Sequence, residues 1–356
     1  MPPSKSSRSS KPKASEIAAE AKKYYIPYIK KNFPHWPAYS HLYRKPMEEL
    51  HLQAPDQLDP PQFEVMKGDA VDIATIMAGV ETERLGDEVR IPFVCAANEK
   101  RPGGDWETGV VGYEERLCRR SNLAAALSLP YLQGAPSNYP IPCEGGILSS
   151  FVTVFRGPGD GCEPLEPQDW RNLPVISIVP TRWPKLSTSG TKYSFAEERD
   201  LVKTKIRAAL RIAVYNKYRH IVIGDFGLGN GARNPPRELA ELWREVFLYD
   251  PEIRGQFAWV AFVFEDTRQS TSKHILDDIA KKSKSSSHHH HGNSSSSSSH
   301  KGKGKAKDTS SHSSSSSNQH SSPSDFEIFQ DVFDEEEIHR VLTQPDPRYG
   351  LSMIAG

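Results

Sequence analysis

The sequence predicts an α/β domain in which a mixed, largely parallel sheet lies between two layers of helices. Two observations predict this fold class. Short apolar runs of strand length alternate with longer segments of helical period along residues 69–264. Strand, helix and strand in succession then imply a three-layer α/β/α arrangement, because helical connections cover both faces of a sheet whose strands run mainly in parallel.

The expected elements follow one another in order. Residues 69–85 carry an apolar stripe of helical period, and a long helix is expected from a capping box of Ser194 and Glu197 to about Asn216. The expected strands are the short apolar runs 89–97, 147–156, 174–180, 220–223 and 256–264. Ligands of such sheets bind in the loops that follow the carboxyl ends of the strands, so functional residues are expected there.

Composition divides the chain around this domain. The hydrophobic fraction of 37% and the mean hydropathy of −0.59 are too polar for one compact domain throughout. Residues 1–14 are expected to be a disordered basic tail, 15–268 the folded domain, and 269–324 a low-complexity Ser/His/Lys linker. Residues 325–356 form an acidic-aromatic tail. It could be a short helix that binds a protein partner, it could pack on the domain, or it could stay disordered.

Charge and cysteine usage exclude several classes of protein. Lys plus Arg equals Asp plus Glu at 45 each, so net charge does not indicate a polyanionic partner. No apolar run approaches the roughly 18 residues that cross a bilayer, and no secretory signal is recognisable. The four cysteines lack CxxC spacing, which favours reduced thiols in the cytoplasm or nucleus and disfavours structural zinc. No metal and no cofactor are expected.

A first glycine loop, residues 98–112, follows the expected strand 89–97. It begins with Asn98 and contains Gly103 and Gly104, and Glu114 and Glu115 stand just behind it at the start of a helix-like segment. Glycines let the backbone approach a ligand closely and turn its N–H groups outward. The plain alternative is that the two acids only favour the helix start through its dipole, by about 0.3–1 kcal/mol each. The combination of amide, glycines and paired acids favours a binding site.

A second glycine loop, residues 224–235, follows the expected strand 220–223. It holds four glycines within eight residues, namely Gly224, Gly227, Gly229 and Gly231. A tight turn needs only one or two glycines, so this loop favours phosphate binding in front of a helix. Asn234 is expected to cap that helix, which opens with Pro235 and Pro236.

Together these segments resemble the microbial-type poly(ADP-ribose) glycohydrolases, whose catalytic domain is macrodomain-like. Their signature is a three-glycine loop followed, six to eight residues later, by Gln-Glu-Glu. Here Gly103-Gly104-Asp105 is followed by seven residues and then Tyr113-Glu114-Glu115. Ala97-Asn98 and the run GDFGLGNGARNPP are also similar, and the likeness spans about residues 18–264.

Two positions depart from the family pattern. Asp105 replaces the third glycine and Tyr113 replaces the glutamine. A carboxylate near a bound diphosphate costs affinity unless it turns away or pairs, and Arg101 is the expected partner. Tyr113 can hydrogen-bond through its hydroxyl but lacks the amide's paired donor and acceptor.

The resemblance implies an activity and a set of site residues. It implies hydrolysis of the ribose glycosidic bond of poly(ADP-ribose), with Glu115 as general acid and base and Glu114 holding the ribose hydroxyls. The remaining residues that the resemblance implies in substrate binding are Asn98, Gly103, Gly104, Asp105, Tyr113, Phe226, Gly227, Gly229 and Gly231. Consecutive residues at a helix start point roughly 100° apart, which favours one acid and one anchor.

Three alternatives to chain hydrolysis stay open. The domain could be an ADP-ribose reader that has lost efficient hydrolysis, or it could remove single ADP-ribose groups from modified protein. A scaffold role carried by the tail is the third.

Overall fold

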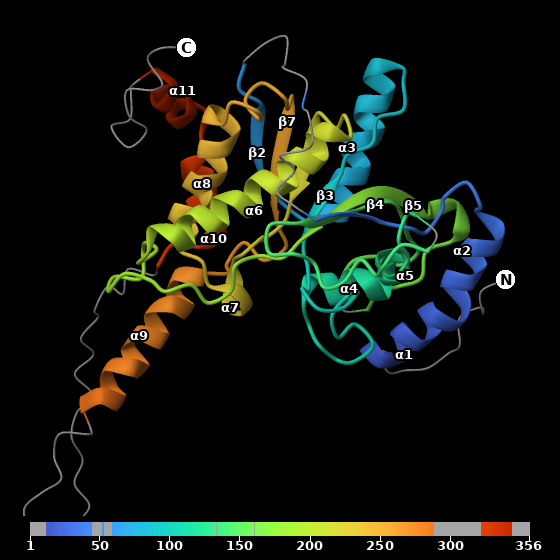
Figure 1. The fold of residues 1–356 in the computed structure, drawn as a ribbon, viewed down its shortest axis with the longest axis horizontal. Helices are drawn as coiled ribbons and strands as arrows, with labels where there is room; N and C mark the ends of the chain where they lie inside the picture. Colours follow the sequence, from blue (N-terminus) through green and yellow to red (C-terminus); the bar gives the residue numbers. More distant parts are fainter. Residues whose placement is uncertain are drawn as a thin grey trace, which may run out of the picture.

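The computed structural model of the chain describes residues 12–44, 52, 59–132, 134–159, 161–287 and 322–343. A single seven-stranded sheet runs through these residues in the order β1-β4-β5-β3-β6-β7-β2 (Figure 1). The strands are β1 (His41–Tyr43), β2 (Gln62–Lys67), β3 (Phe93–Ala96), β4 (Gly146–Val154), β5 (Arg171–Ile178), β6 (His220–Ile223) and β7 (Trp259–Phe264).

Five strands of this sheet run in parallel. β3 pairs with β5 on one side and β6 on the other, β6 pairs with β7, and β7 pairs with β2, all in parallel. β4 and β1 continue the sheet beyond β5 in antiparallel pairs. The expected mixed, largely parallel sheet is therefore confirmed.

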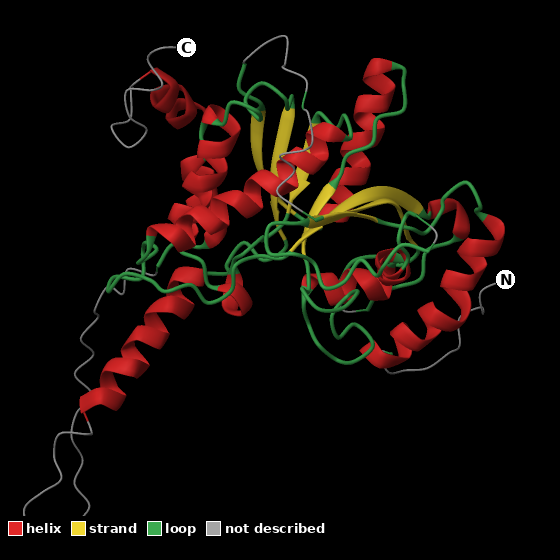
Figure 2. Ribbon diagram, viewed as in Figure 1, coloured by secondary structure: helices red, strands yellow, loops and turns green. Residues whose placement is uncertain are grey.

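Helices cover both faces of the sheet (Figure 2). They are α1 (Ala14–Glu20), α2 (Ile26–Asn32), α3 (Ala70–Leu85), α4 (Tyr113–Arg120), α5 (Leu123–Ser128), α6 (Ala196–Tyr215), α7 (Gly229–Ala232), α8 (Pro236–Tyr249), α9 (Thr271–Ser287), α10 (Asp325–Val332) and α11 (Glu335–Thr343). A π-helical turn (Ala21–Tyr25) joins α1 to α2, and a 3₁₀ turn (Pro167–Asp169) precedes β5.

Alternation along the strands creates two separate apolar layers. Val94 packs with α6, α8 and α10, whereas its neighbours Phe93 and Cys95 pack with the helices α1 to α5 on the other face. Likewise Val222 lies on the opposite face from Ile221 and Ile223. This period of two is what a strand that is buried on both sides requires, and it accounts for the continuous apolar runs in the sequence.

The C-terminal segment 325–343 belongs to the domain core. The Phe329 side chain is 2% exposed and its ring centroid lies 5.2 Å from that of Phe264 on β7. Phe333 stacks 4.4 Å from Phe262, and Arg244 of α8 donates to the Val332 carbonyl at 3.1 Å. Of the alternatives left open for this tail, packing on the domain is the one observed for residues 325–343, where Phe329, Val332 and Phe333 are buried in the core.

The first part of the expected linker, residues 269–324, is helical and not a flexible segment. Residues 271–287 form helix α9, which extends away from the sheet in Figure 1. The Ser and His runs at 288–321, the basic residues 1–11 and the last residues 344–356 lie outside the described part of the chain. Among the described helices, none has the length and apolar character to cross a bilayer.

Several helix ends correct the sequence expectations. Helix α6 begins at Ala196 with Phe195 at its cap and no side-chain cap, and the backbone amide of Ser194 donates to the Lys185 carbonyl at 2.8 Å. Asn234 does not cap α8 either. Pro235 occupies the cap, with Pro236 as the first helical residue.

Two elements were broken or shortened relative to expectation. The helix after the first glycine loop is interrupted at Ser121, whose extended backbone bridges to Val154. Strand β3 begins only at Phe93, because Pro92 precedes it and cannot donate to a ladder. Strands β1 and β2 and the N-terminal helices were not expected from the sequence.

Candidate active site

The two glycine loops lie at the same edge of the sheet. β3 and β6 are parallel neighbours, so the loops that leave their carboxyl ends emerge side by side. Helix α4, which follows the first loop, and helix α7, which lies within the second, are found along the lower edge of the sheet in Figure 1. The structure thus brings together the two segments that the sequence pointed to.

In the first loop, glycines allow the backbone to lie directly against α4. Gly103 and Gly104 have φ of +70° and +58°, in the left-handed region that favours glycine. A Cβ on Gly103 would lie 2.7 Å from the Cys118 sulfur, and one on Gly104 would lie 2.5 Å from Glu115 Oε1 and 3.3 Å from Asn98 Nδ2. Gly104, Glu115 and Asn98 therefore converge at one point.

Asn98 organises the turn into the loop. Its side-chain Oδ1 accepts from the backbone amides of Lys100 and Arg101 at 2.9 and 3.2 Å. Its own backbone amide donates to Glu114 Oε2 at 2.6 Å. Because its Oδ1 is held by the loop, its Nδ2 is the group that faces Gly104.

Asp105 pairs away from the glycines. Its carboxylate forms an ion pair with Arg101 at 2.7 Å, and both side chains are substantially exposed. The partner expected for Asp105 is thus the one observed, and the pair removes the main electrostatic objection to an anionic ligand beside this loop.

Glu114 is a buried carboxyl group with one uncommitted oxygen. The residue is 3% exposed, and its Oε1 has no hydrogen-bond partner among the described residues. Burial raises its pKa to about 8 and the neighbouring Glu115 reinforces this shift, while the backbone amides of Asn98 and Gly103 and the charge of Arg182 oppose it. At neutral pH Glu114 is therefore mostly protonated and can donate a hydrogen bond from a position inside the domain.

Glu115 points in a different direction from Glu114. Both stand in the first turn of α4, where the helix dipole favours acidic groups. Glu114 is turned inward to Asn98, whereas the half-buried Glu115 carboxyl lies against Gly104 and Gly112 of the loop. The two acids do not face each other across a common gap, which agrees with one acid and one anchor.

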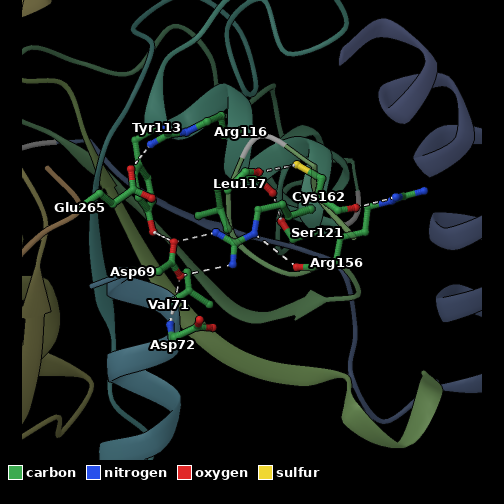
Figure 3. A network of polar contacts seen from close by, with 12 residues as sticks. Asp69, Val71, Asp72, Tyr113, Arg116, Leu117, Ser121, Arg156, Cys162 and Glu265 are labelled. Atoms are coloured by element: carbon green, nitrogen blue, oxygen red, sulfur yellow. Dashed lines mark hydrogen bonds and ion pairs between the residues drawn. The ribbon is translucent and has the colours of Figure 1, made fainter. Parts of the chain in front are cut away.

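Tyr113 is tied into a polar network beneath α4 (Figure 3). Its hydroxyl donates to Asp69 Oδ2 at 3.2 Å, and its ring lies 5.2 Å from Phe93. Asp69 caps α3 by accepting from the Asp72 amide, and it forms a buried ion pair with Arg120 at 2.7 Å. Burial opposes ionisation of Asp69, but the Arg120 guanidinium holds its pKa below the usual value. The network joins the start of α3 to the end of α4 and so orients the helix that carries both glutamates.

The second loop is held by its own side chains and by distant ones. Asn234 bonds through Nδ2 to the carbonyls of Gly227 and Thr181, both at 2.8 Å, which explains why it does not cap α8. Gly227 and Gly229 have φ of +79° and +72°. The Gly229 amide donates to Thr271 Oγ1 at 2.6 Å, so this N–H is engaged by the protein itself.

Phe226 and Gly231 occupy opposite environments. Phe226 is 3% exposed and packs edge-on against Trp243 at 5.8 Å, so its ring is a core residue and not a surface for a ligand. The reason is that the chain turns inward after β6, toward α8. Gly231 is exposed, and nothing lies within 4 Å of where its Cβ would be.

A pocket of about 340 Å³ opens beside Asn98. Its volume falls within the range of small-molecule sites. Three cationic side chains, Lys100, Arg182 and Lys205, line it together with the backbone segment after β5. Lys205 is buried and donates to the Cys143 carbonyl at 2.6 Å. The sequence reasoning missed Arg182 and Lys205, although Arg182 follows an expected strand and could have been found by that rule.

The described residues do not gather three or more metal-binding side chains at any point. The site contains the buried, protonated carboxyl of Glu114, the half-buried carboxyl of Glu115 beside a glycine turn, the side-chain amide of Asn98 and the basic pocket next to it.

The largely parallel α/β/α sandwich, with glycine loops converging beside paired glutamates, is the architecture that the sequence resemblance implies. Residues 13–157 match the family model described as microbial-type PARG, catalytic domain. The second glycine loop lies beyond the matched segment.

Solved structures resemble the chain in fold. A poly(ADP-ribose) glycohydrolase from Thermomonospora curvata is 21% identical with a TM-score of 0.52, covering 75% of this chain and 98% of its own. One from Deinococcus radiodurans, in complex with ADP-ribose, is 19% identical with a TM-score of 0.48, covering 72% of this chain and 98% of its own. No curated sequence relative matches the chain.

Proposed function

We propose that this protein hydrolyses the ribose glycosidic bond of poly(ADP-ribose) and releases ADP-ribose. The observation that carries the proposal is the position of Glu115, whose carboxyl lies against Gly104 beside Asn98 within the family-matched segment. A glycine turn that lets a ligand approach the backbone closely beside a carboxyl suits a substrate with an acid-labile bond.

Glu115 supplies the proton in this mechanism. It donates to the oxygen that leaves the anomeric carbon, the C–O bond breaks through an oxocarbenium-like transition state, and water then adds to that carbon. The carboxylate left on Glu115 takes the proton from the attacking water, which restores the acid. No other proton donor is needed for the cycle to balance.

Glu114 acts as the anchor for the ribose. Because its pKa is raised to about 8, its uncommitted Oε1 can donate to a ribose hydroxyl without placing a second negative charge beside Glu115. Asn98 Nδ2 lies beside Gly104 and Glu115 and offers a second donor. The ribose is thereby held while the charge on Glu115 changes.

The diphosphate is expected to lie between the two glycine loops. Gly103 and Gly104 let the diphosphate approach the backbone on one side, although the Gly104 amide donates to the Arg101 carbonyl at 3.1 Å. Gly227 and Gly231 serve the other side, and Gly229 supports the loop from below, because its amide is bonded to Thr271. The free thiols Cys95, Cys118, Cys143 and Cys162 support a reducing, intracellular compartment for this activity.

The test is Glu115→Gln, with poly(ADP-ribose) and mono-ADP-ribosylated protein as parallel substrates. A positioned general acid is worth about 10²–10⁴ in rate, so turnover should fall by that factor while ADP-ribose affinity stays within a few-fold. Glu107→Gln is the matched control, since Glu107 is exposed and paired with Lys22. Retained turnover in Glu115→Gln would show that the acid is assigned wrongly. Release from the mono-modified substrate alone would point to a mono-ADP-ribosyl hydrolase.

A further inference from the structure

A buried chain of hydrogen bonds links the C-terminal helix α10 to the second glycine loop. The Gly229 amide donates to Thr271 Oγ1 at 2.6 Å, and the Thr271 hydroxyl donates to Asp325 Oδ2 at 2.7 Å. The Thr271 amide also donates to Asp325 Oδ1 at 2.8 Å. Thr271 and Asp325 are both 0% exposed. The three residues come from three segments that are far apart in the sequence.

Asp325 is held by several donors. Besides Thr271, the Gln269 side chain donates to Oδ2 at 3.1 Å, and the Asp325 amide donates to the Gln269 carbonyl at 2.8 Å. A buried carboxyl is costly unless it is hydrogen-bonded, so its place here depends on these contacts. With its proton directed to Asp325, the Thr271 hydroxyl presents a lone pair, polarised by the carboxyl, to Gly229.

The loop therefore has two anchors of different origin. Asn234, a few residues away in sequence, binds the Gly227 carbonyl at 2.8 Å. Thr271 and Asp325 hold Gly229, whose φ of +72° places it at the turn into α7. Without the second anchor the Gly229 amide would be buried and unsatisfied, which favours a shift of this turn.

We propose that Thr271 and Asp325 are positioning residues that hold the second glycine loop in its ligand-binding conformation. The inference rests on the proposed function, in which this loop contacts the diphosphate of the substrate. A loop that is ordered before binding does not have to be ordered by the ligand, so the anchor should appear in affinity more than in the chemical step. The C-terminal segment thus contributes to the site although it touches no substrate.

A purely structural role makes different predictions. If Thr271 only joins α9 to α10, removing its hydroxyl should lower stability and leave the affinity of the folded protein unchanged. Valine replaces the hydroxyl with a methyl of similar shape, whereas serine keeps the hydroxyl and loses the methyl. Comparing Thr271→Val with Thr271→Ser therefore separates the hydrogen bond from the packing.

The experiment measures ADP-ribose binding by calorimetry and hydrolysis of poly(ADP-ribose), using the full chain. Thr271→Val should raise the Kd and the KM about tenfold, with kcat within about threefold, because a buried amide loses its acceptor. Thr271→Ser should stay within about twofold of the unchanged protein. Thr153→Val is the matched control: Thr153 is also 0% exposed and accepts from Asn172 at 3.3 Å, but it lies on β4, away from the loop.

Each outcome decides between the proposals. An unchanged Kd and KM in Thr271→Val, with normal binding by the unsubstituted chain, would overturn the positioning role alone. Equal impairment of the Val and Ser variants would also overturn it, because packing and not the hydroxyl would then matter. Failure of the unsubstituted chain to bind ADP-ribose would overturn the proposed function, and the positioning role would fall with it.

Discussion

The raised pKa of Glu114 predicts a specific dependence of stability on pH. Its carboxyl has an ordinary pKa of 4.5 and a folded pKa of about 8, chiefly because it is buried. The folded state therefore binds a proton that the unfolded state has lost between these two pH values, and stability falls as pH rises through that window. The difference between the two pKa values corresponds to a loss of about 5 kcal/mol in the free energy of unfolding, of which about 4 kcal/mol is lost between pH 5 and pH 9.

Replacing Glu114 by Gln removes the titrating carboxyl, and with it this pH dependence of stability, while keeping the shape of the side chain. When the pH is raised from 5 to 9, the free energy of unfolding of Glu114→Gln should rise by about 4 kcal/mol relative to that of the unsubstituted chain. The measurement is the free energy of unfolding by urea at several pH values for both proteins. Glu83→Gln, on the exposed side of α3, should follow the unsubstituted chain at every pH.

Parallel stability curves for Glu114→Gln and the unsubstituted chain would refute this reasoning. They would mean that Glu114 is charged in the folded protein at neutral pH. The carboxyl could then only accept hydrogen bonds, and its proposed role as a donor to ribose would have to be abandoned.

Two further substitutions test the site and the fold. Gly104→Ala places a Cβ 2.5 Å from Glu115 Oε1 at a φ of +58°, so hydrolysis should fall more than about tenfold and the free energy of unfolding by about 1–2 kcal/mol. Gly109→Ala is the control and should be neutral, because nothing lies within 4 Å of where its Cβ would be. Equal activity of the two variants would contradict the geometry. Phe329→Ala, at a side chain 2% exposed, should cost about 3–5 kcal/mol in urea unfolding, and a loss below about 1 kcal/mol would mean that α10 is not docked.

The strands and the long helices could be predicted because their patterns are local. The run 220–223 matches β6 at both ends, and 69–85 differs from α3 only by its cap residue. Helix starts were less predictable. Ser194 has the residue type and spacing of a cap, but the cap position is Phe195, and the backbone amide of Ser194 pairs with the Lys185 carbonyl, a contact that no local pattern reveals.

The candidate site was predicted in outline and not in detail. The order and spacing of Gly103, Gly104, Glu114 and Glu115 identified the first loop, because a glycine turn before a helix has a local signature. The burial of Phe226 against Trp243 could not be predicted, since the side on which a loop residue packs depends on the helix opposite it.

The C-terminal segment shows the same limit most clearly. Its aromatic residues alternate with acids, a pattern equally suited to a partner helix and to the domain's own core. Only the apolar face left open by α8, β2 and β7 decides between them, and α10 fills it.

The sequence by itself determined the fold class, the order of the elements between residues 69 and 264 and the two glycine loops, because backbone propensity and periodicity are properties of neighbouring residues. The tertiary structure alone decided which glutamate is buried and protonated and how Asp325 comes to support Gly229. These features depend on solvent exclusion and on contacts between segments far apart in the chain, and such contacts exist only once the layers have packed.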